Sequence, residues 1–251
     1  MPKYSIKRRN KIVVDQWGEP FLEGFYPSTE ELAKKQVPGI VRLLNLKKPI
    51  QILDCPCGWG RHSNLLAKLG HKVIGIDITK RFIEMARAKA PKDNPPTFKV
   101  ADMRKLKMNE EYDVILNLRG SFGYFDRYTD FRVLKSFVKG LRPNGQLMID
   151  QFNRERLVRL PPTVWFKLPG GKLFLIKQSF DLTKGTYSVE YIVVTGRRER
   201  IMRMTINWYT VAEYRAMFER LGMKRLRFYG DFDGSEYTLE SNQQIVIATK
   251  E

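Results

Sequence analysis

Between residues 49 and 152, short apolar runs alternate with segments of helical periodicity, and this alternation restricts the chain to a parallel sheet wound with helices. Five strands are expected at 49–54, 71–77, 97–102, 112–118 and 146–152. The helices between them are expected at 61–70, 79–90 and 128–141. A further helix at 210–222 and two strands at 224–230 and 243–250 complete the pattern. The sequence therefore predicts an α/β fold with a Rossmann-like, doubly wound sheet.

Residues 163–207 have a different rhythm. They contain four β-rich stretches separated by the turn sequences "PGG" and "TKG", with no helical segment between them. This pattern predicts antiparallel hairpins inserted after the fifth strand. We expect three parts: a basic lead-in and cap helix (1–48, with the helix at 28–46 kinked at Pro38), a core (49–152 and 208–251), and a β-rich insertion that forms a substrate cap (153–207).

The chain is strongly basic along its whole length. It has 45 Lys and Arg against 27 Asp and Glu, a formal net charge of +18. Such a field attracts polyanions, although a charge-rich thermophile surface is the alternative explanation. A charge-rich surface normally contains acidic and basic residues in similar numbers, whereas acidic residues are clearly fewer here. This imbalance favours a nucleic-acid partner. No apolar run is long enough to span a bilayer and the N-terminus lacks an apolar signal core, so we expect no membrane partner and a cytoplasmic protein.

Cys55 and Cys57 are the only cysteines, and a single residue separates them. A disulfide across one residue is strained, so two thiols are expected. His62 and His71 complete a set of four possible zinc ligands, but the spacing is not that of a finger or knuckle. We therefore expect no metal.

The sequence "DCPCGWGRH" (54–62) follows the first predicted strand. Gly58 and Gly60 let backbone N–H groups approach a ligand closely. The first three strands each end in an aspartate, and Asp77 follows Gly58 by 19 residues, where a carboxylate accepts both ribose hydroxyls of a nucleoside. Asp102 is placed to meet an adenine amino group. A nicotinamide-binding loop fits less well, because Ser63 stands where its third glycine belongs.

The segment "ILDCPCGWGRH" (52–62) resembles the motif "VLDxGCGxGRH" of the class I S-adenosylmethionine-dependent methyltransferases. The resemblance covers residues 50–152 well and the rest more loosely. It implies a seven-stranded sheet with an antiparallel last strand and S-adenosylmethionine as cofactor. Pro56 and Trp59 depart from the pattern. The cofactor-binding residues that it implies are Asp54, Cys55, Cys57, Gly58, Gly60, Arg61, Asp77, Ile78, Asp102, Met103 and Asn117.

The same resemblance places the active site beside "NLRGSFGYF" (117–125), the segment after the fourth strand. The candidate catalytic residues in it are Asn117, Arg119 and Tyr124. No general base stands out, which favours a neutral nitrogen as the methyl acceptor.

The β-rich insertion combines arginines with aromatic residues, as RNA-binding surfaces do, although alternate aromatics in a hairpin face its core. The candidate RNA contacts are Arg197, Arg198, Arg200, Trp165 and Tyr209. We therefore expect methylation of a base, at a nitrogen, in structured RNA such as rRNA or tRNA. Two alternatives stay open: a small-molecule N- or O-methyltransferase, and a cofactor-binding subunit that needs a partner protein.

Overall fold

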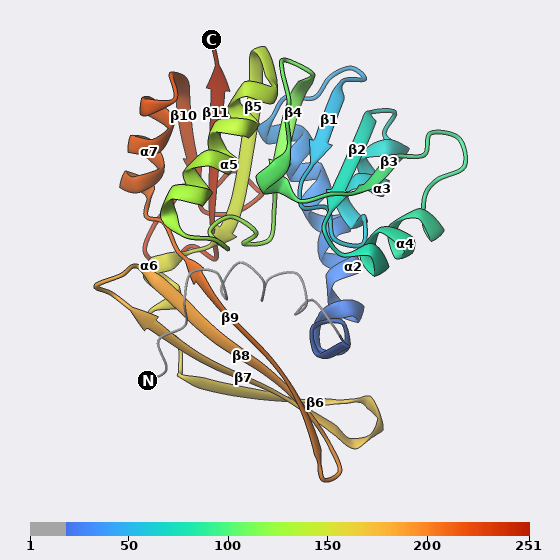
Figure 1. Ribbon diagram of the computed structural model, residues 1–251, viewed down its shortest axis with the longest axis vertical. Helices are drawn as coiled ribbons and strands as arrows, with labels where there is room; N and C mark the ends of the chain where they lie inside the picture. Colours follow the sequence, from blue (N-terminus) through green and yellow to red (C-terminus); the bar gives the residue numbers. More distant parts are fainter. Residues whose placement is uncertain (1–18) are drawn as a thin grey trace.

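The computed structural model describes residues 19–251 (Figure 1). Residues 1–18, the first part of the predicted lead-in, lie outside the described residues. The helices are α2 (Glu19–Leu43), α3 (Arg61–Lys68), α4 (Lys80–Ala88), α5 (Arg127–Gly140), α6 (Arg154–Leu157) and α7 (Val211–Arg220). Short 3₁₀ turns are η1 (Met103–Lys105) and η2 (Pro169–Gly171). No described helix combines the length and the apolar character needed to cross a membrane.

A seven-stranded sheet forms the larger part of the molecule. Its strands are β1 (Gln51–Asp54), β2 (Lys72–Asp77), β3 (Thr97–Val100), β4 (Tyr112–Asn117), β5 (Leu141–Phe152), β10 (Met223–Tyr229) and β11 (Gln243–Lys250). They lie in the order β10-β11-β5-β4-β1-β2-β3, and β11 runs antiparallel to both of its neighbours. This confirms the predicted doubly wound sheet with an antiparallel last strand. The order makes the carboxyl ends of β4, β1, β2 and β3 neighbours along one edge.

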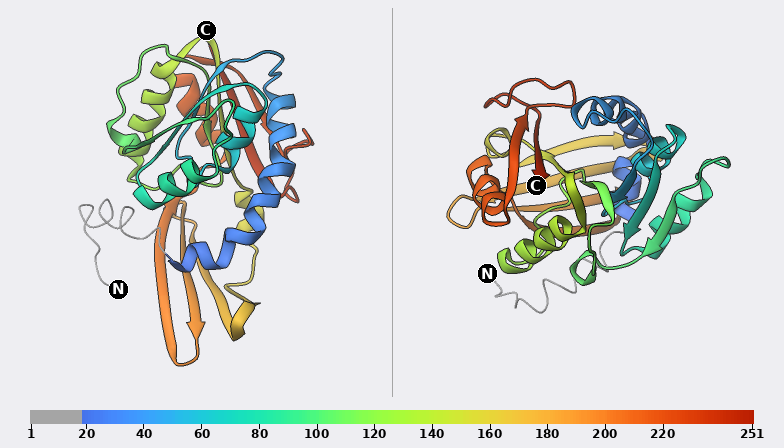
Figure 2. Two further views of the ribbon diagram at one scale, coloured as in Figure 1. Left: turned by 90° about the vertical axis from the view of Figure 1, so that its right-hand side faces the viewer. Right: turned by 90° about the horizontal axis from the view of Figure 1, so that it is seen from above.

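Both faces of the sheet are covered by helices, which explains why its central strands are continuous apolar runs. Leu53 of β1 and Ile115 of β4 pack in one core with Phe137 of α5 and Phe218 of α7. On the other face, Ile52 and Leu116 pack with Leu66 of α3 and with residues of α2. Successive strand residues therefore anchor opposite layers (Figure 2).

Two elements differ clearly from the sequence-based expectation. β5 begins at Leu141 rather than residue 146, because Leu141 already pairs with Tyr112 of β4. α2 spans Glu19–Leu43 rather than 28–46, and it is continuous through Pro38, where a kink was expected. Its change of direction lies in its first turns (Figure 2). Val37 and Ile40, on either side of that proline, are buried in the core, and this packing holds the helix in place.

A second, antiparallel sheet contains β6 (Thr163–Leu168), β7 (Lys172–Asp181), β8 (Thr186–Thr195) and β9 (Arg198–Asn207) in that order. It confirms the hairpins predicted after the fifth strand. The sheet lies at the carboxyl edge of the large sheet (Figure 1). Its inner end joins the main core, where Tyr187 and Val189 of β8 pack in one cluster with Tyr124 and Phe125.

Asp130 of α5 ties the second sheet to the segment that follows β4. This aspartate is 1% exposed. Its carboxylate accepts hydrogen bonds from the backbone N–H of Phe125 at 3.1 Å, the Asn207 amide at 2.7 Å and the Tyr209 hydroxyl at 2.9 Å. One buried charge thus aligns a helix, an active-site segment and the end of β9.

Replacing this carboxylate is expected to destabilise the fold. Asp130→Ala leaves several buried donors without an acceptor, and we expect the free energy of unfolding to fall by about 3 kcal/mol. Urea unfolding followed by circular dichroism measures the change. Asp93→Ala, at an exposed position, is the matched control and should shift stability by less than about 0.5 kcal/mol. A loss for Asp130→Ala no larger than that of the control would contradict the role assigned to this residue.

Candidate active site

The loop between β1 and α3 is folded back onto the end of β2. Gly58 and Gly60 have φ values of 53° and 75°, which side-chain-bearing residues rarely adopt. The Asp77 carboxylate accepts a hydrogen bond from the Gly58 N–H at 3.0 Å and one from the Thr79 N–H at 2.8 Å. A Cβ at Gly60 would lie 2.7 Å from Ala86, whereas a Cβ at Gly58 would meet nothing within 4 Å. Gly60 is thus needed for packing, and Gly58 leaves open space beside a ligand.

Three aspartates at the ends of neighbouring strands line a cavity at this loop. They are Asp54, the last residue of β1, Asp77, the last residue of β2, and Asp102, which follows β3. Asp54 accepts a 2.5 Å hydrogen bond from the Ser63 hydroxyl, and Asp102 forms an ion pair with Arg104 at 2.6 Å. The convergence predicted from the sequence is therefore present in the fold. A nucleoside bearing hydroxyl and amino groups fits such a row of acceptors.

The surroundings of these carboxyl groups shift their pKa values in opposite directions. Desolvation raises the pKa of Asp54 to about 7, and the bond from Ser63 and the charge of Arg61 only partly offset this. Desolvation likewise raises the pKa of Asp77. Asp102 is less buried, and its contacts with Arg104 outweigh desolvation and lower its pKa. Asp54 is consequently the group whose charge is most easily changed near neutral pH.

Most of the residues expected to bind the cofactor line the cavity. Nine of them do so: Asp54, Cys55, Cys57, Gly58, Arg61, Asp77, Ile78, Asp102 and Met103. Pro56, Trp59, His62 and Phe82 also line it, and the sequence pattern did not single out His62 and Phe82. Trp59 meets Phe82 edge-on at 5.3 Å and carries the Arg61 guanidinium 4.5 Å above its ring. Within residues 19–251, no three His, Cys, Asp or Glu side chains gather as a metal site.

Two expected site residues have other positions. Asn117 is fully buried beneath the cavity, where its amide donates to the Cys55 carbonyl at 2.9 Å and joins β4 to β1. It does not line the cavity, although its side-chain oxygen is buried without a hydrogen-bond partner, and its role in catalysis or cofactor binding stays a prediction. Tyr209 is 2% exposed and its hydroxyl is bonded to Asp130. A base cannot stack on it, and its predicted role in RNA binding is wrong.

Arg119 and Tyr124 do line the cavity, beyond the glycine loop. Arg119 has a φ of 63°, and Asp150 at the end of β5 holds its backbone: the Arg119 N–H donates to the Asp150 carboxylate at 3.1 Å, and the Gly120 N–H donates to the Asp150 carbonyl at 2.8 Å. The charge of Arg119 acts on the phenols of Tyr124 and of Tyr191 of β8. Burial raises the pKa of both phenols, that of Tyr191 to about 12.

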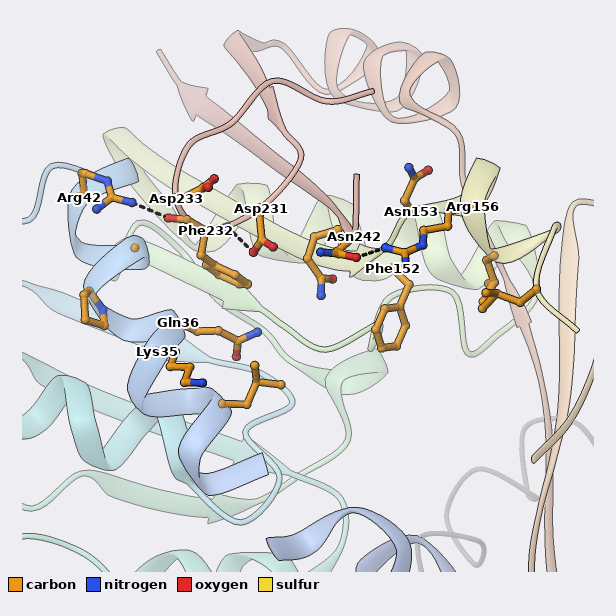
Figure 3. A pocket seen from close by; sticks show the side chains of 16 residues that line it. Lys35, Gln36, Arg42, Phe152, Asn153, Arg156, Asp231, Phe232, Asp233 and Asn242 are labelled. Carbon is orange, nitrogen blue, oxygen red and sulfur yellow. Dashed lines mark hydrogen bonds between the residues drawn. The ribbon is translucent and has the colours of Figure 1, made fainter. Parts of the chain in front are cut away.

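A second cavity of about 690 Å³ lies next to the first. It is bounded by α2, the end of β5, α6 and the segment before β11 (Figure 3). Two pairs of side chains connect the linings of the two cavities: the His62 Nε2–H donates a 2.9 Å hydrogen bond to the Gln36 side-chain oxygen, and the Arg119 guanidinium lies 5.5 Å above the Phe152 ring. The two spaces are therefore neighbours at these two places.

The expected RNA-contact residues of the insertion lie elsewhere. Arg197, Arg198 and Arg200 surround the turn between β8 and β9, which is the tip of the second sheet farthest from the large sheet (Figure 1). Trp165 of β6 is 59% exposed. None of the four lines either cavity.

Residues 52–145, which hold the glycine loop and the three aspartates, match the family model described as a methyltransferase domain. The chain is a class I S-adenosylmethionine-dependent methyltransferase. The glycine loop lets the cofactor approach the protein backbone closely. The row of carboxylates provides acceptors for the hydroxyl and amino groups of the cofactor's nucleoside. The methyltransferase thus uses S-adenosylmethionine, the cofactor expected from its sequence.

The methyltransferase is similar to proteins that act on different acceptors. It is 32% identical over 161 residues to a ubiquinone biosynthesis O-methyltransferase of Pelagibacter ubique, covering 61% of this chain and 65% of the relative. It is 22% identical over 220 residues to the cypemycin N-terminal methyltransferase of a Streptomyces species, covering 85% and 89%. The structure of CalS10, an amino pentose methyltransferase of Micromonospora echinaspora, superposes with a TM-score of 0.70 at 16% identity, covering 94% of this chain and 99% of that one.

The raised pKa of Asp54 predicts pH-dependent binding of the cofactor. If this carboxylate faces the cofactor's ammonium group, only its ionised form attracts the ligand. We therefore expect the affinity for S-adenosylhomocysteine to fall by up to about tenfold per pH unit as the pH drops below about 7. Calorimetric titration between pH 5.5 and 8.5 measures this.

Asp54→Asn should bind more weakly at high pH and show a shallower pH profile, whereas Asp93→Asn should retain the wild-type profile. A flat profile for the wild-type protein would show that Asp54 does not bear on the ligand's charge.

Proposed function

We propose that this methyltransferase acts on a small molecule, and that the acceptor atom is an amine nitrogen. The observation that carries the proposal is the second cavity beside the cofactor cavity. Its volume of about 690 Å³ lies within the range of pockets that enclose drug-sized ligands. Its lining residues Gln36 and Phe152 contact His62 and Arg119 of the cofactor cavity, so an acceptor seated there lies beside that cavity.

The packing of α2 over the cofactor cavity is also consistent with a small acceptor. Leu22 at the start of α2 packs with Trp59 and Phe82 of the cofactor cavity. Two residues on, Gly24 lies so close to Phe174 of β7 that a Cβ there would be 2.5 Å from the ring. α2 thus bridges the glycine loop and the second sheet. This cover over part of the cofactor cavity limits the access of water and restricts the size of what enters.

The acid–base properties of the acceptor side favour nitrogen. The bound cofactor supplies an activated methyl group on its sulfonium. The phenols of Tyr124 and Tyr191 have raised pKa values and stay protonated at neutral pH, so they donate hydrogen bonds and do not remove protons. His62 is fully buried, and desolvation holds its pKa well below the usual value. A neutral amine attacks through its lone pair without a base, whereas an aliphatic hydroxyl needs one.

The names of the similar proteins are compatible with this proposal. One is named for an N-terminus, one for an amino pentose, a sugar that carries an amine, and one for an O-methyl transfer in ubiquinone biosynthesis. RNA methylation rested on the net charge of +18 and on the insertion. It is less well supported, since Tyr209 is buried and the arginine-rich turn is remote from the cavities.

A labelling experiment tests the proposal. The purified protein is incubated with methyl-labelled S-adenosylmethionine and, separately, with the low-molecular-mass fraction or the total RNA of the same cells. We expect label in the small-molecule fraction, in compounds that lose an amine proton on methylation, and none in RNA digested to nucleosides. Label that appears in a nucleoside and in no metabolite would overturn the proposal.

A further inference from the structure

Arg119 is an arginine for which the fold provides no anionic hydrogen-bond partner. Within residues 19–251 its guanidinium donates no hydrogen bond and forms no ion pair, and its only close contact of this kind is the face of Phe152. Its neighbour Asp150 accepts a hydrogen bond from the Arg119 backbone N–H at 3.1 Å and is close enough to feel the guanidinium charge, but no hydrogen bond joins this carboxylate to the guanidinium. A half-buried guanidinium in a cavity is costly to desolvate unless a ligand supplies the missing acceptor.

A second arginine increases the positive charge at this point. The Arg61 guanidinium donates to the Thr29 carbonyl at 3.0 Å and stacks on Trp59. The charge of Arg119 lowers the pKa of Arg61, in addition to the larger effect of burial, so that it lies at about 10. The two like charges therefore act on one another across the cavity. A bound anion would relieve this repulsion.

The two arginines lie on different sides of the cavity, which indicates different roles. Arg61 is the first residue of α3 and belongs to the glycine loop, which is the cofactor's side of the cavity. Arg119 lies on the segment after β4, one strand further, against Phe152 of the second cavity. Its charge reaches the phenol of Tyr124, which lines the cofactor cavity, and the phenol of Tyr191 on β8.

We propose that the acceptor carries a carboxylate and that Arg119 binds it. The inference rests on the proposed small-molecule function and specifies its substrate class as an amino acid-like compound, with an amine for the methyl group and a carboxylate for orientation. Arginine holds a carboxylate through two parallel hydrogen bonds, which fixes the direction of the acceptor as well as its position. The anion also screens the guanidinium from the cofactor's sulfonium, a second positive charge in the same cavity. Arg119 is thus a substrate-binding residue. It cannot act as a base, because a guanidinium stays protonated.

Anion binding to the protein loaded with S-adenosylhomocysteine tests this inference without any methyl transfer. The probes are two matched pairs, benzoate with benzamide and acetate with acetamide, titrated by calorimetry or ligand-observed NMR. The wild-type complex should bind each carboxylate at least tenfold more tightly than its amide. Arg119→Gln should lose this preference, and Arg119→Lys should retain only part of it, since an ammonium lacks the two-pronged geometry.

Two measurements show whether Arg119 binds the carboxylate of the acceptor or the carboxylate of the cofactor. The affinity for S-adenosylhomocysteine should stay within about threefold of wild type in Arg119→Gln. Arg142→Gln, which removes an exposed arginine paired with Asp113, controls for the change in net charge and should behave as wild type. If Arg119→Gln weakens S-adenosylhomocysteine binding tenfold and leaves the carboxylate preference intact, Arg119 serves the cofactor and the inference fails. Equal binding of carboxylates and amides by the wild type also overturns it, whatever the labelling experiment shows about small molecules and RNA.

Discussion

The hydrogen bond from the Gly58 N–H to the Asp77 carboxylate is the contact on which the active site depends. It joins the loop after β1 to the end of β2, and the same carboxylate also caps the Thr79 N–H at the start of α4. The bond can form because β1 and β2 are adjacent parallel strands whose carboxyl ends lie on one edge. A loop held in this way keeps its backbone exposed to the ligand with no side chain from Gly58 in between.

The acceptor side is assembled from parts that are distant in the sequence. Asp130 brings the segment after β4 together with the end of β9, and Asp150 holds the unusual backbone of Arg119. α2 connects the glycine loop to the second sheet, since Leu22 packs with Trp59 and Gly24 lies against Phe174. Binding and orientation are therefore the protein's main contributions to methyl transfer, as expected for a reaction with a pre-activated donor.

The sequence was sufficient to predict the sheet and the cofactor loop, because both leave local signals. Strand and helix periods alternate through residues 49–152, and the glycines and aspartates of the loop lie at fixed places relative to strand ends. Local patterns do not show which way a side chain points. Tyr209 was therefore misassigned, because its hydroxyl is bonded to Asp130 inside the core. The sequence also does not indicate that the amide of Asn117 joins two strands under the cavity. The second cavity left no signal, since its walls come from α2, β5, α6 and the segment before β11.

The central claim is that carboxylates at the ends of parallel strands hold the adenosyl part of the cofactor while the glycine loop holds its amino acid end. A crystal structure of the protein with S-adenosylhomocysteine tests this most directly. The account predicts both ribose hydroxyls within hydrogen-bond distance of Asp77, the adenine beside Asp102 and Met103, and the sulfur directed toward Arg119. Density for the ligand at another place, or a ribose that does not touch Asp77, would contradict it.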